Sequence, residues 1–327
     1  MRTGRMTNGS FQDGADDVHG KVIGQARKAQ KPHSKKSLDP SEKRMNYRHI
    51  YHAGNFADVL KHAVLARLVI YLQQKDKAFR VLDTHAGIGL YDLSSDESQK
   101  TGEWLGGIGK LLDAELTPAA TDVLKPYLDV VRALNPQGGL TRYPGSPKLA
   151  RDLFRPQDRL SAMELHPDDC RTLSRLFEGD YQARITELDG WLALGAHLPP
   201  KEKRGIVLVD PPFELDGEYE RLVDGLARAY RRFSAGVYCL WYPIKKGAPI
   251  AAFHEALKET GIPKMLCAEL SVKSDRDLTG LSGSGLIIVN PPFTLKDELH
   301  ALLPELKRVL AQDRYASQRC FWLRGEE

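Results

Sequence analysis

The most informative segment of the sequence is V-L-V-D-P-P-F at residues 207–213. An apolar strand there delivers the carboxyl group of Asp210 into a Pro-Pro turn, which is followed by the aromatic ring of Phe213. Proline fixes φ, carries no N–H donor and biases the preceding residue towards an extended conformation, so hydrogen-bond acceptors are aimed outwards. Such acceptors suit a flat amino group whose lone pair is withdrawn into an aromatic ring, and Phe213 can stack on that ring. The segment therefore predicts a site that holds a weakly nucleophilic exocyclic amine while it attacks an electrophile.

A second copy of this motif, I-I-V-N-P-P-F, occupies residues 287–293. The first copy is expected to end the fourth strand of a sheet, beside a glycine turn, whereas the second is expected to end the last strand. Ligands of open α/β sheets bind where the strand order reverses, beside the first strand. We therefore expect Asp210 to be functional and residues 290–293 to form a structural turn.

The charge of the chain is unevenly distributed. The 327 residues suffice for a full α/β core, and their net charge is +4. The first 45 residues hold ten of the 47 Lys and Arg but only five of the 43 Asp and Glu, so the remainder is close to neutral. Any nucleic-acid surface on the body of the protein must therefore be a local patch.

The cysteines and the hydrophobic pattern bound the setting of the protein. No C-x-x-C pair occurs, which disfavours a zinc site or a disulfide framework, so no metal is expected. No apolar run reaches the roughly 20 residues that span a bilayer, and the N-terminus lacks an apolar signal core. A reduced, cytoplasmic location without membrane attachment is the expectation. The four cysteines are Cys170, Cys239, Cys267 and Cys320.

The elements that must position Asp210 follow from the hydrophobic periodicity. A helix is expected from Asn55, which can cap it, to about Gln73, with Asp58 in its first turn. Helix-length segments such as 218–232 and 248–260 separate the strands. Seven strands with intervening helices predict an α/β fold around a mostly parallel sheet. The strand candidates are 79–82, 160–164, 184–188, 206–210, 236–241, 265–270 and 285–289.

Composition and hydrophobic periodicity also predict the domain organisation of the chain. Residues 1–44 are polar without sustained periodicity and are expected to be a disordered basic extension. Residues 93–139 have a helical pattern and are expected to be a helical insertion into a catalytic domain formed by 45–92 and 140–327. After the insertion, Y-P-G-S-P is expected to open a helix with Ser146 as its cap and Pro147 in its first turn.

Three strand ends carry residues suited to a nucleoside cofactor. Gly87 and Gly89 follow the first strand, although G-x-G alone is a weak signal and no third glycine completes a dinucleotide fingerprint. Glu164 closes the second main strand, and once the insertion is discounted its spacing suits an acid that holds ribose hydroxyls. Asp189 and Gly190 close the third strand, where the acid can accept the adenine amino group of S-adenosylmethionine.

These residues resemble those of a known family, the bacterial 23S rRNA adenine-N6 methyltransferases. The resemblance covers about residues 45–323, including the helical insertion, and leaves out 1–44. It implies a Rossmann-like class I methyltransferase that modifies one adenine of 23S rRNA, adenine 2030 in ribosomal numbering, as a monomer without an obligate protein partner. The rRNA is expected to be naked or in early assembly particles. The motifs are M-N-Y-R-H-I-Y-H-A-G-N-F-A-D-V-L-K-H at 45–62, D-T-H-A-G-I-G, Y-P-G-S-P, M-E-L-H-P, D-G at 189–190 and D-P-P-F.

The resemblance also implies roles for individual residues. Asp210 is the expected catalytic acceptor, and Phe213 stands where family members often carry Tyr, which keeps stacking but removes a phenolic hydrogen bond. The residues alone leave His62 and His85 open between packing and ligand contact. The expected substrate-binding residues are Tyr47, His49, Lys61 and Phe213. The expected cofactor contacts are His62, His85, Ser146, Glu164, Asp189, Gly190 and Asp210.

Three other functions remain open from the residues. A DNA adenine-N6 methyltransferase would use the same D-P-P-F motif, and a protein-glutamine methyltransferase fits the N-P-P-F copy. A non-catalytic RNA-binding module would bind RNA without S-adenosylmethionine.

A target base paired within a helix has to be flipped out or to lie in an irregular region. Candidate RNA contacts are Arg228, Arg231, Arg232, Lys245, Lys246, Lys273 and Arg276.

Overall fold

The structure is a computed structural model that describes residues 48–274 and 280–325. Residues Met45–Glu327 form one compact unit. The expectations for the extension 1–44 and for Tyr47 lie outside the described residues.

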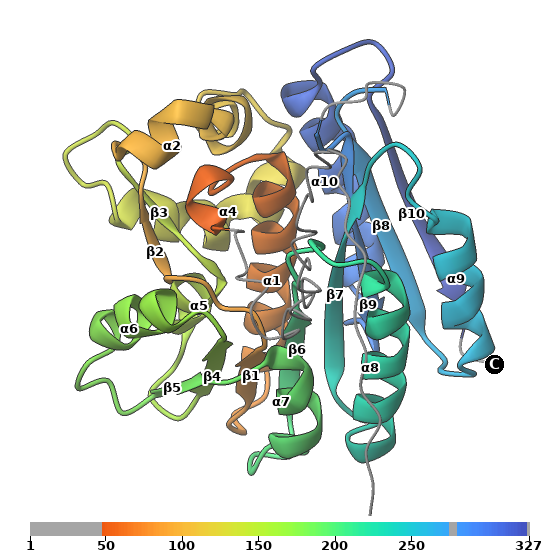
Figure 1. Ribbon diagram of the computed structural model, residues 1–327. Helices are drawn as coiled ribbons and strands as arrows, with labels where there is room; N and C mark the ends of the chain where they lie inside the picture. The colour runs from red at the N-terminus through yellow and green to blue at the C-terminus, as the bar shows by residue number, and fades with distance from the viewer. Residues whose placement is uncertain (1–47, 275–279, 326–327) are drawn as a thin grey trace, which may run out of the picture. The chain divides into compact units, whose positions relative to one another are not determined.

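An eight-stranded sheet forms the centre of this unit, with the order β10-β8-β9-β7-β6-β1-β4-β5 (Figure 1). Five neighbouring strands are parallel, and β9, β8 and β10 join them through antiparallel pairs. The expected Rossmann-like α/β architecture is therefore confirmed. The strands are β1 (Arg80–Asp83), β4 (Arg159–Glu164), β5 (Ala183–Glu187), β6 (Gly205–Val209), β7 (Val237–Ile244), β8 (Met265–Ser271), β9 (Gly283–Val289) and β10 (Ser317–Arg324).

The expected count of seven strands was wrong by one. All seven predicted strands are present, but β10 adds an eighth strand at the edge of the sheet. Most of its side chains are exposed or half-buried, because only one neighbour, β8, pairs with it. It therefore lacks the apolar run that marks the buried strands.

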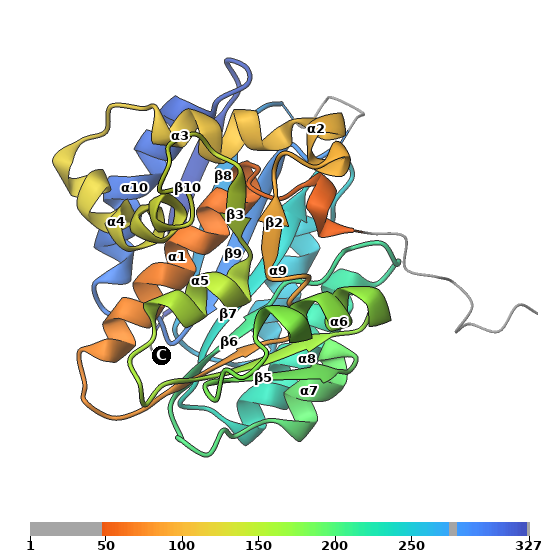
Figure 2. The same ribbon diagram turned by 90° about the vertical axis from the view of Figure 1, so that its left-hand side faces the viewer.

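Helices cover both faces of the sheet, as Figures 1 and 2 show. One hydrophobic core lies between the sheet and α1 (Phe56–Gln73), α5 (Ser146–Leu153), α6 (Pro167–Leu176) and α10 (Leu295–Leu310). The other lies between the sheet and α7 (Gly190–Ala196), α8 (Glu218–Arg232) and α9 (Ile250–Glu259). Helix α1 packs against α4, α5 and α10 as well as the sheet, which explains why it is apolar on nearly all sides.

A helical segment lies between two short strands that pair with each other. Strands β2 (Leu90–Asp92) and β3 (Arg142–Pro144) form a two-stranded antiparallel sheet. The segment between them contains α2 (Asp96–Thr101), the π-helical turn η3 (Leu105–Gly109), α3 (Lys110–Leu112) and α4 (Pro118–Ala133). It lies towards the top of Figure 2, and its helix α4 packs on α1 and α10.

The strand order decides which chain segments share one edge of the sheet. Strand β1 pairs in parallel with both β4 and β6, so the carboxyl ends of all three strands lie at the same edge. The glycine turn after β1 and Asp210 after β6 are thereby brought to adjacent positions. Among the described residues, no helix is both long and apolar enough to cross a membrane.

Candidate active site

Asp210 follows directly after the last residue of β6 and faces a buried lysine. Lys61 Nζ lies 2.5 Å from Asp210 Oδ2, although 149 positions of sequence separate the two residues. Lys61 belongs to α1, which packs on β6, so the two elements bring the charges together. Two residues predicted independently, one as the catalytic acceptor and one as a substrate contact, are thus in direct contact.

Lys61 contacts a second carboxylate, Asp58, one turn earlier in the same helix. Its Nζ lies 2.8 Å from Asp58 Oδ1, and its side chain is only 5% exposed. Burial alone would lower the pKa of the ammonium group, but Asp210 and Asp58 outweigh burial and raise this pKa above its usual value. Lys61 therefore stays charged although its side chain is almost fully buried.

Asp58 connects the start of α1 to the segment that precedes it. Its Oδ2 accepts hydrogen bonds from the backbone N–H of Gly54 and from His49 Nε2, each at 2.9 Å. Burial would raise the pKa of Asp58, but the charges of His49 and Lys61 hold it well below its usual range. The carboxylate is therefore ionised and engaged through both oxygens.

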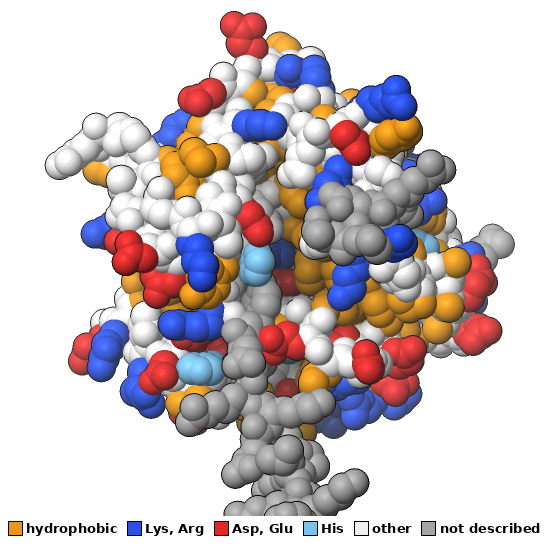
Figure 3. Space-filling view, turned by 45° about the horizontal axis from the view of Figure 1, so that its top comes forward, with side chains coloured by type: hydrophobic (Ala, Val, Ile, Leu, Met, Phe, Trp, Pro, Cys, Tyr) orange, Lys and Arg blue, Asp and Glu red, His pale blue; other side chains and the backbone are white. Residues whose placement is uncertain are grey.

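A pocket of about 440 Å³ opens beside these charges. It has aromatic walls from Phe213 and Trp241 and exposed ammonium groups from Lys245 and Lys246. Figure 3 brings the top of Figure 1 forward and shows hydrophobic side chains beside Lys and Arg side chains around a central hollow. The remaining lining residues are His49, His52, Asn55, Ala57, Asp58, Lys61, Glu103, Asp210, Pro212, Pro243, Gly280 and Leu281.

The ring of Phe213 is fixed by its neighbours and by its backbone. It lies edge-on to Tyr219 at 4.8 Å and to Trp241 at 5.7 Å between ring centroids. Its φ is +53°, a left-handed conformation that costs a bulky residue energy and often marks a functional site. Such a ring can offer a face or an edge to a flat base in the pocket.

His62 does not line this pocket, although it is the neighbour of Lys61. It is 1% exposed, and its Nδ1 is hydrogen-bonded at 2.7 Å to the hydroxyl of Tyr143, which in turn contacts the hydroxyl of Tyr127. Burial lowers the pKa of His62 to about 3. The residue is therefore a neutral, packed histidine here, and its expected contact with the cofactor stays a prediction.

The glycine turn is tied to Glu164, the residue expected to hold a ribose. Glu164 Oε2 accepts the backbone N–H of Gly87, and Oε1 accepts that of His166, both at 2.8 Å. Burial raises the pKa of this carboxyl group above its usual value. Gly87 and Gly89 have φ of +62° and +79°, so the turn uses conformations that favour glycine. The acid and the turn thus form one structural unit.

Ser146 was expected to cap helix α5, but it does not. The N-cap is Gly145, and Ser146 is the first helical residue. Its hydroxyl instead donates to Oδ2 of Asp83 at 2.6 Å, because Asp83 is fully buried at the end of β1 and needs a donor. Burial raises the pKa of Asp83 to about 6.

Asp189, Gly190 and His85 meet beside the end of β1. Asp189 caps α7 by accepting the backbone N–H of Trp191 at 2.9 Å. A Cβ atom on Gly190 would lie 2.1 Å from the carbonyl oxygen of Thr84, so only glycine fits there. His85 is hydrogen-bonded to the Thr84 hydroxyl at 2.8 Å, and burial lowers its pKa to about 3.

The predicted residues therefore fall into two neighbouring groups. His49, Lys61, Asp210 and Phe213 line the pocket, whereas the expected cofactor residues other than His62 and Asp210 surround the ends of β1, β4 and β5. The two groups meet at Asp83, which lies close enough to Asp210 and Lys61 for their charges to affect its pKa. The cofactor group consists of His85, Ser146, Glu164, Asp189 and Gly190.

Sequence reasoning missed a third contribution, which comes from the helical segment. Glu103, between α2 and η3, lines the pocket and accepts from Asn55 Nδ2 at 3.0 Å. His52 Nδ1 lies 3.0 Å from Glu103 Oε1, and this hydrogen bond raises the pKa of His52. No pattern in the sequence links Glu103 to residues about 50 positions earlier. Asp58, in contrast, was recognisable as an acid one helical turn before Lys61.

The second motif copy lies at the opposite edge of the sheet. Strand β9 runs antiparallel to β7, and Val289 pairs with Tyr238 near the start of β7. The side-chain amide of Asn290 donates to the carbonyl oxygens of Ser234 and Gly236, each at 2.8 Å. These bonds agree with the expected structural turn. Strand β9 was expected to be the last strand of the chain, but β10 follows it.

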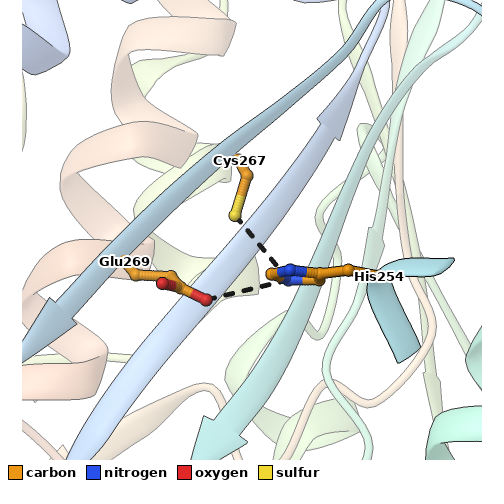
Figure 4. Close-up of side chains that lie close together, drawn as sticks. All are labelled: His254, Cys267 and Glu269. Atoms are coloured by element: carbon orange, nitrogen blue, oxygen red, sulfur yellow. Dashed lines mark hydrogen bonds and ion pairs between the residues drawn. The ribbon is translucent and has the colours of Figure 1, made fainter. Parts of the chain in front are cut away.

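A separate buried cluster contains side chains of the kinds that bind metals. His254, Cys267 and Glu269 offer ligand atoms within 4.8 Å of one another, as Figure 4 shows. The hydroxyl of Tyr242, however, lies 3.0, 3.3 and 2.8 Å from the three ligand atoms. Arg319 also donates to Glu269 at 2.7 Å. Protein groups therefore satisfy this cluster as a hydrogen-bond network.

Known proteins resemble this chain in sequence and in fold. A family model described as ribosomal RNA large subunit methyltransferase D, RlmJ, matches residues 76–324. A protein of Escherichia coli named ribosomal RNA large subunit methyltransferase J is 44% identical over 262 residues, which cover 80% of this chain and 92% of that protein. Its namesake in Haemophilus influenzae is 41% identical over 283 residues, covering 86% and 100%. The crystal structure of protein LPL1258 from Legionella pneumophila superposes with a TM-score of 0.76 at 36% identity, covering 83% and 98%.

Proposed function

The chain belongs to the RlmJ family of ribosomal RNA large subunit methyltransferases, and on this basis we propose that it methylates N6 of one adenine in 23S rRNA. The single observation that carries the site assignment is the position of Asp210. Its carboxylate lies at the carboxyl end of β6, beside the glycine turn after β1, and lines a pocket with aromatic and basic walls. An unpaired adenine has the flat amino group and the ring that such a pocket suits.

The proposed methyl donor is S-adenosylmethionine, and the residues at the ends of β1, β4 and β5 fit it. Gly87 and Gly89 give a turn without side chains, and Gly190 keeps the neighbouring backbone close. Glu164 would hold the ribose hydroxyls, Asp189 would accept the adenine amino group, and His85 and Ser146 would shape the cavity between them. S-adenosylmethionine supplies an electrophilic methyl group on a sulfonium centre, so the protein needs to supply only alignment and polar stabilisation.

The chemistry assigned to the protein is to hold and orient the amine. Asp210 and the carbonyl group of the Pro-Pro turn would accept the two N6 hydrogens and draw the nitrogen towards tetrahedral geometry. Phe213 would stack on the base, and Lys61 would fix the carboxylate of Asp210. No covalent enzyme intermediate is needed, and the proton would leave to water after transfer.

Further parts of the proposal concern the substrate. The monomeric protein would act in the cytoplasm on naked rRNA or early assembly particles. Lys245 and Lys246 are exposed at the pocket and are proposed RNA contacts. The helical segment between β2 and β3 is proposed to be an insertion that completes the pocket through Glu103. Tyr47 would contribute to RNA binding from outside the described residues.

The decisive experiment is to incubate the purified protein with labelled S-adenosylmethionine and unmodified large-subunit rRNA, and to map the modified base by mass spectrometry. Asp210→Asn is expected to lower the rate constant for methyl transfer at least about a hundredfold, because it removes the preorganised acceptor. Asn290→Ala is the matched control, since this second copy lies at the opposite edge and should retain transfer.

Three outcomes would contradict the proposal. Methylation of duplex DNA but not of rRNA fragments would favour a DNA adenine methyltransferase. Transfer to glutamine in a protein acceptor, lost in Asn290→Ala but kept in Asp210→Asn, would favour a protein methyltransferase. RNA binding without any S-adenosylmethionine binding would instead indicate a non-catalytic module.

A further inference from the structure

We propose that Asp58 is a positioning residue for methyl transfer, which places the ammonium group of Lys61 and, through Lys61, the carboxylate of Asp210. The inference rests on the proposed function of the pocket and adds a residue to it. Asp58 does not need to touch the substrate for this role. It acts because Lys61 lies between two carboxylates and can be held in one place only by both.

The position of the Lys61 ammonium group depends on both of its carboxylate partners. A lysine side chain is a point charge on a flexible four-carbon stem, so one ion pair leaves its ammonium group free to move around its partner. Here Nζ lies 2.8 Å from Asp58 Oδ1 and 2.5 Å from Asp210 Oδ2. Contacts on both sides place the ammonium group between the carboxylates.

Asp58 is itself held in place by several hydrogen bonds. Its side chain is 1% exposed, and its Oδ2 accepts from the backbone N–H of Gly54 and from His49 Nε2. Its own backbone N–H donates to the capping side chain of Asn55 at 3.1 Å. Asp58 is therefore held by His49, Gly54 and Asn55, which precede it in the chain, while its Oδ1 is directed at Lys61. It is a better reference point than a mobile surface carboxylate.

The position of Lys61 in turn affects Asp210. Because Lys61 engages Oδ2, it orients the carboxylate plane and directs Oδ1 away from itself. Without the charge of Asp58, the ammonium group would be attracted by Asp210 alone and could shift to bridge both of its oxygens. It would then compete with the amine of the substrate for the same acceptor. The predicted consequence is slower transfer with little change in binding.

Asp58 also lies in the first turn of α1, where a negative charge stabilises any helix. The experiment must separate this structural role from positioning. Asp58→Glu keeps the charge at the helix start but moves the carboxylate by one methylene, so a role limited to the helix-start charge predicts wild-type activity. Asp58→Asn keeps the shape and removes the charge. Glu298→Gln is the matched control, because it removes the charge that pairs with Arg67. Arg67 lies on the same helix as Asp58, and its Nη2 lies 2.7 Å from Glu298 Oε1.

The test is a double-mutant cycle, measured as single-turnover methyl transfer to the rRNA substrate. Asp58→Asn and Asp58→Glu are each expected to lower the rate constant roughly ten- to a hundredfold, with the KM for RNA and S-adenosylmethionine within about twofold. In a Lys61→Met background, adding Asp58→Asn should change the rate less than about twofold, since Asp58 acts through Lys61. Glu298→Gln should retain the wild-type rate.

Several results would overturn the proposal. Both Asp58 variants could transfer methyl groups at the wild-type rate, or Asp58→Asn could lower the rate by the same factor with and without Lys61. Thermal unfolding of each variant identifies any loss of methyl transfer that is due to unfolding. If Asp58→Asn is unfolded, the transfer rate of Asp58→Glu, which keeps the helix-start charge, decides between the structural role and positioning. Transfer by the wild-type protein in the same assay tests the proposed function separately.

Discussion

At the scale of single residues, the candidate site is a chain of ionic contacts from His49 through Asp58 and Lys61 to Asp210. The sequence supported three of these four residues, two of them through the family resemblance. Asp58 was recognised only as a first-turn acid, because helix periodicity shows its proximity to Lys61 but not to residues outside the helix. The backbone hydrogen bond from Gly54 and the contact of Lys61 with Asp210 depend on tertiary packing, which no local pattern encodes.

Ser146 shows the opposite error at this scale. Its type and its place before Pro147 fit a helix cap, and local capping preference is a sound guide when nothing competes. A buried carboxyl group at the end of β1 does compete, and the serine hydroxyl donates to Asp83 instead. The serine hydroxyl donates to Oδ2, whereas Oδ1 accepts from the backbone N–H of His85, and leaving the buried Oδ2 without a donor costs at least about as much as one cap contributes.

His62 leads to a prediction about acid stability. Its pKa is about 3 in the folded protein and 6.5 when exposed, so the unfolded chain binds one more proton as the pH falls below 6.5. Its contribution to stability is therefore complete above about pH 7.5 and declines on acidification. Between about pH 7.5 and 5.5, the free energy of unfolding should fall by about 1.4 kcal/mol more in the wild type than in His62→Asn.

Urea unfolding of both proteins at the two pH values measures this difference. Asp83 has its pKa raised to about 6, so it acts in the opposite direction over part of the same range, but it does so equally in both proteins. Parallel losses of stability in the wild type and in His62→Asn would show that the folded protein can protonate this histidine.

At the scale of elements, buried strands were the most predictable features. All seven predicted strands were placed to within a few residues, because six of them read as largely buried apolar runs; the edge strand β5 is half-buried or exposed throughout. The edge strand β10 and the short strands β2 and β3 were missed. Strand β10 has one neighbour and a mixed composition, and β2 finds its partner β3 only across the intervening helical segment.

The docking of that helical segment onto α1 gives a second prediction. The backbone N–H of Ile108 donates to the carbonyl oxygen of Gly54 at 2.9 Å, and a Cβ atom on Gly107 would lie 2.1 Å from the same oxygen. Gly107→Ala should therefore push the segment off the start of α1. We expect a loss of about 2 kcal/mol or more in the free energy of unfolding, with slower methyl transfer.

Gly106→Ala is the control for this prediction. A Cβ atom there meets nothing within 4 Å, although the residue is adjacent in the same turn. Chemical denaturation of the two variants should separate them clearly. Equal stabilities would mean that the backbone around Gly107 relaxes without consequence, and that the close approach to Gly54 is not needed.

At the scale of the whole molecule, the positive charge that could attract RNA to the body of the protein lies in local patches. Outside the first 45 residues the chain is nearly neutral, so long-range attraction to RNA is weak and the placement of individual cations matters. Lys245 and Lys246 lie at the end of β7, beside the pocket and Trp241. Sequence could list these lysines as one candidate patch among several, but only the fold singles them out as pocket residues.

The third prediction concerns the salt dependence of RNA binding. If Lys245 and Lys246 each neutralise one phosphate, replacing both by alanine should weaken rRNA binding and lower the slope of log K against log salt by about 1.4. S-adenosylmethionine binding should be unaffected. Fluorescence anisotropy with an rRNA fragment over a range of salt concentrations measures the slope.

Lys201 and Lys203 supply the control pair, because they are exposed just before β6 and so lie at the opposite edge of the sheet. Their replacement by alanine should leave the slope close to the wild-type value. Identical slopes for all three proteins would place the RNA elsewhere on the surface.

The side chain of Asn55 limits how this scaffold can be altered. Its oxygen accepts the backbone N–H groups of Ala57 and Asp58, and its nitrogen donates to Glu103. One amide thus serves the first helix and the intervening segment simultaneously. Anyone who grafts a shorter or foreign segment between β2 and β3 must supply an acceptor where Glu103 now stands. Otherwise the transplant would disturb the entrance to the lysine-bearing helix, and with it the catalytic machinery.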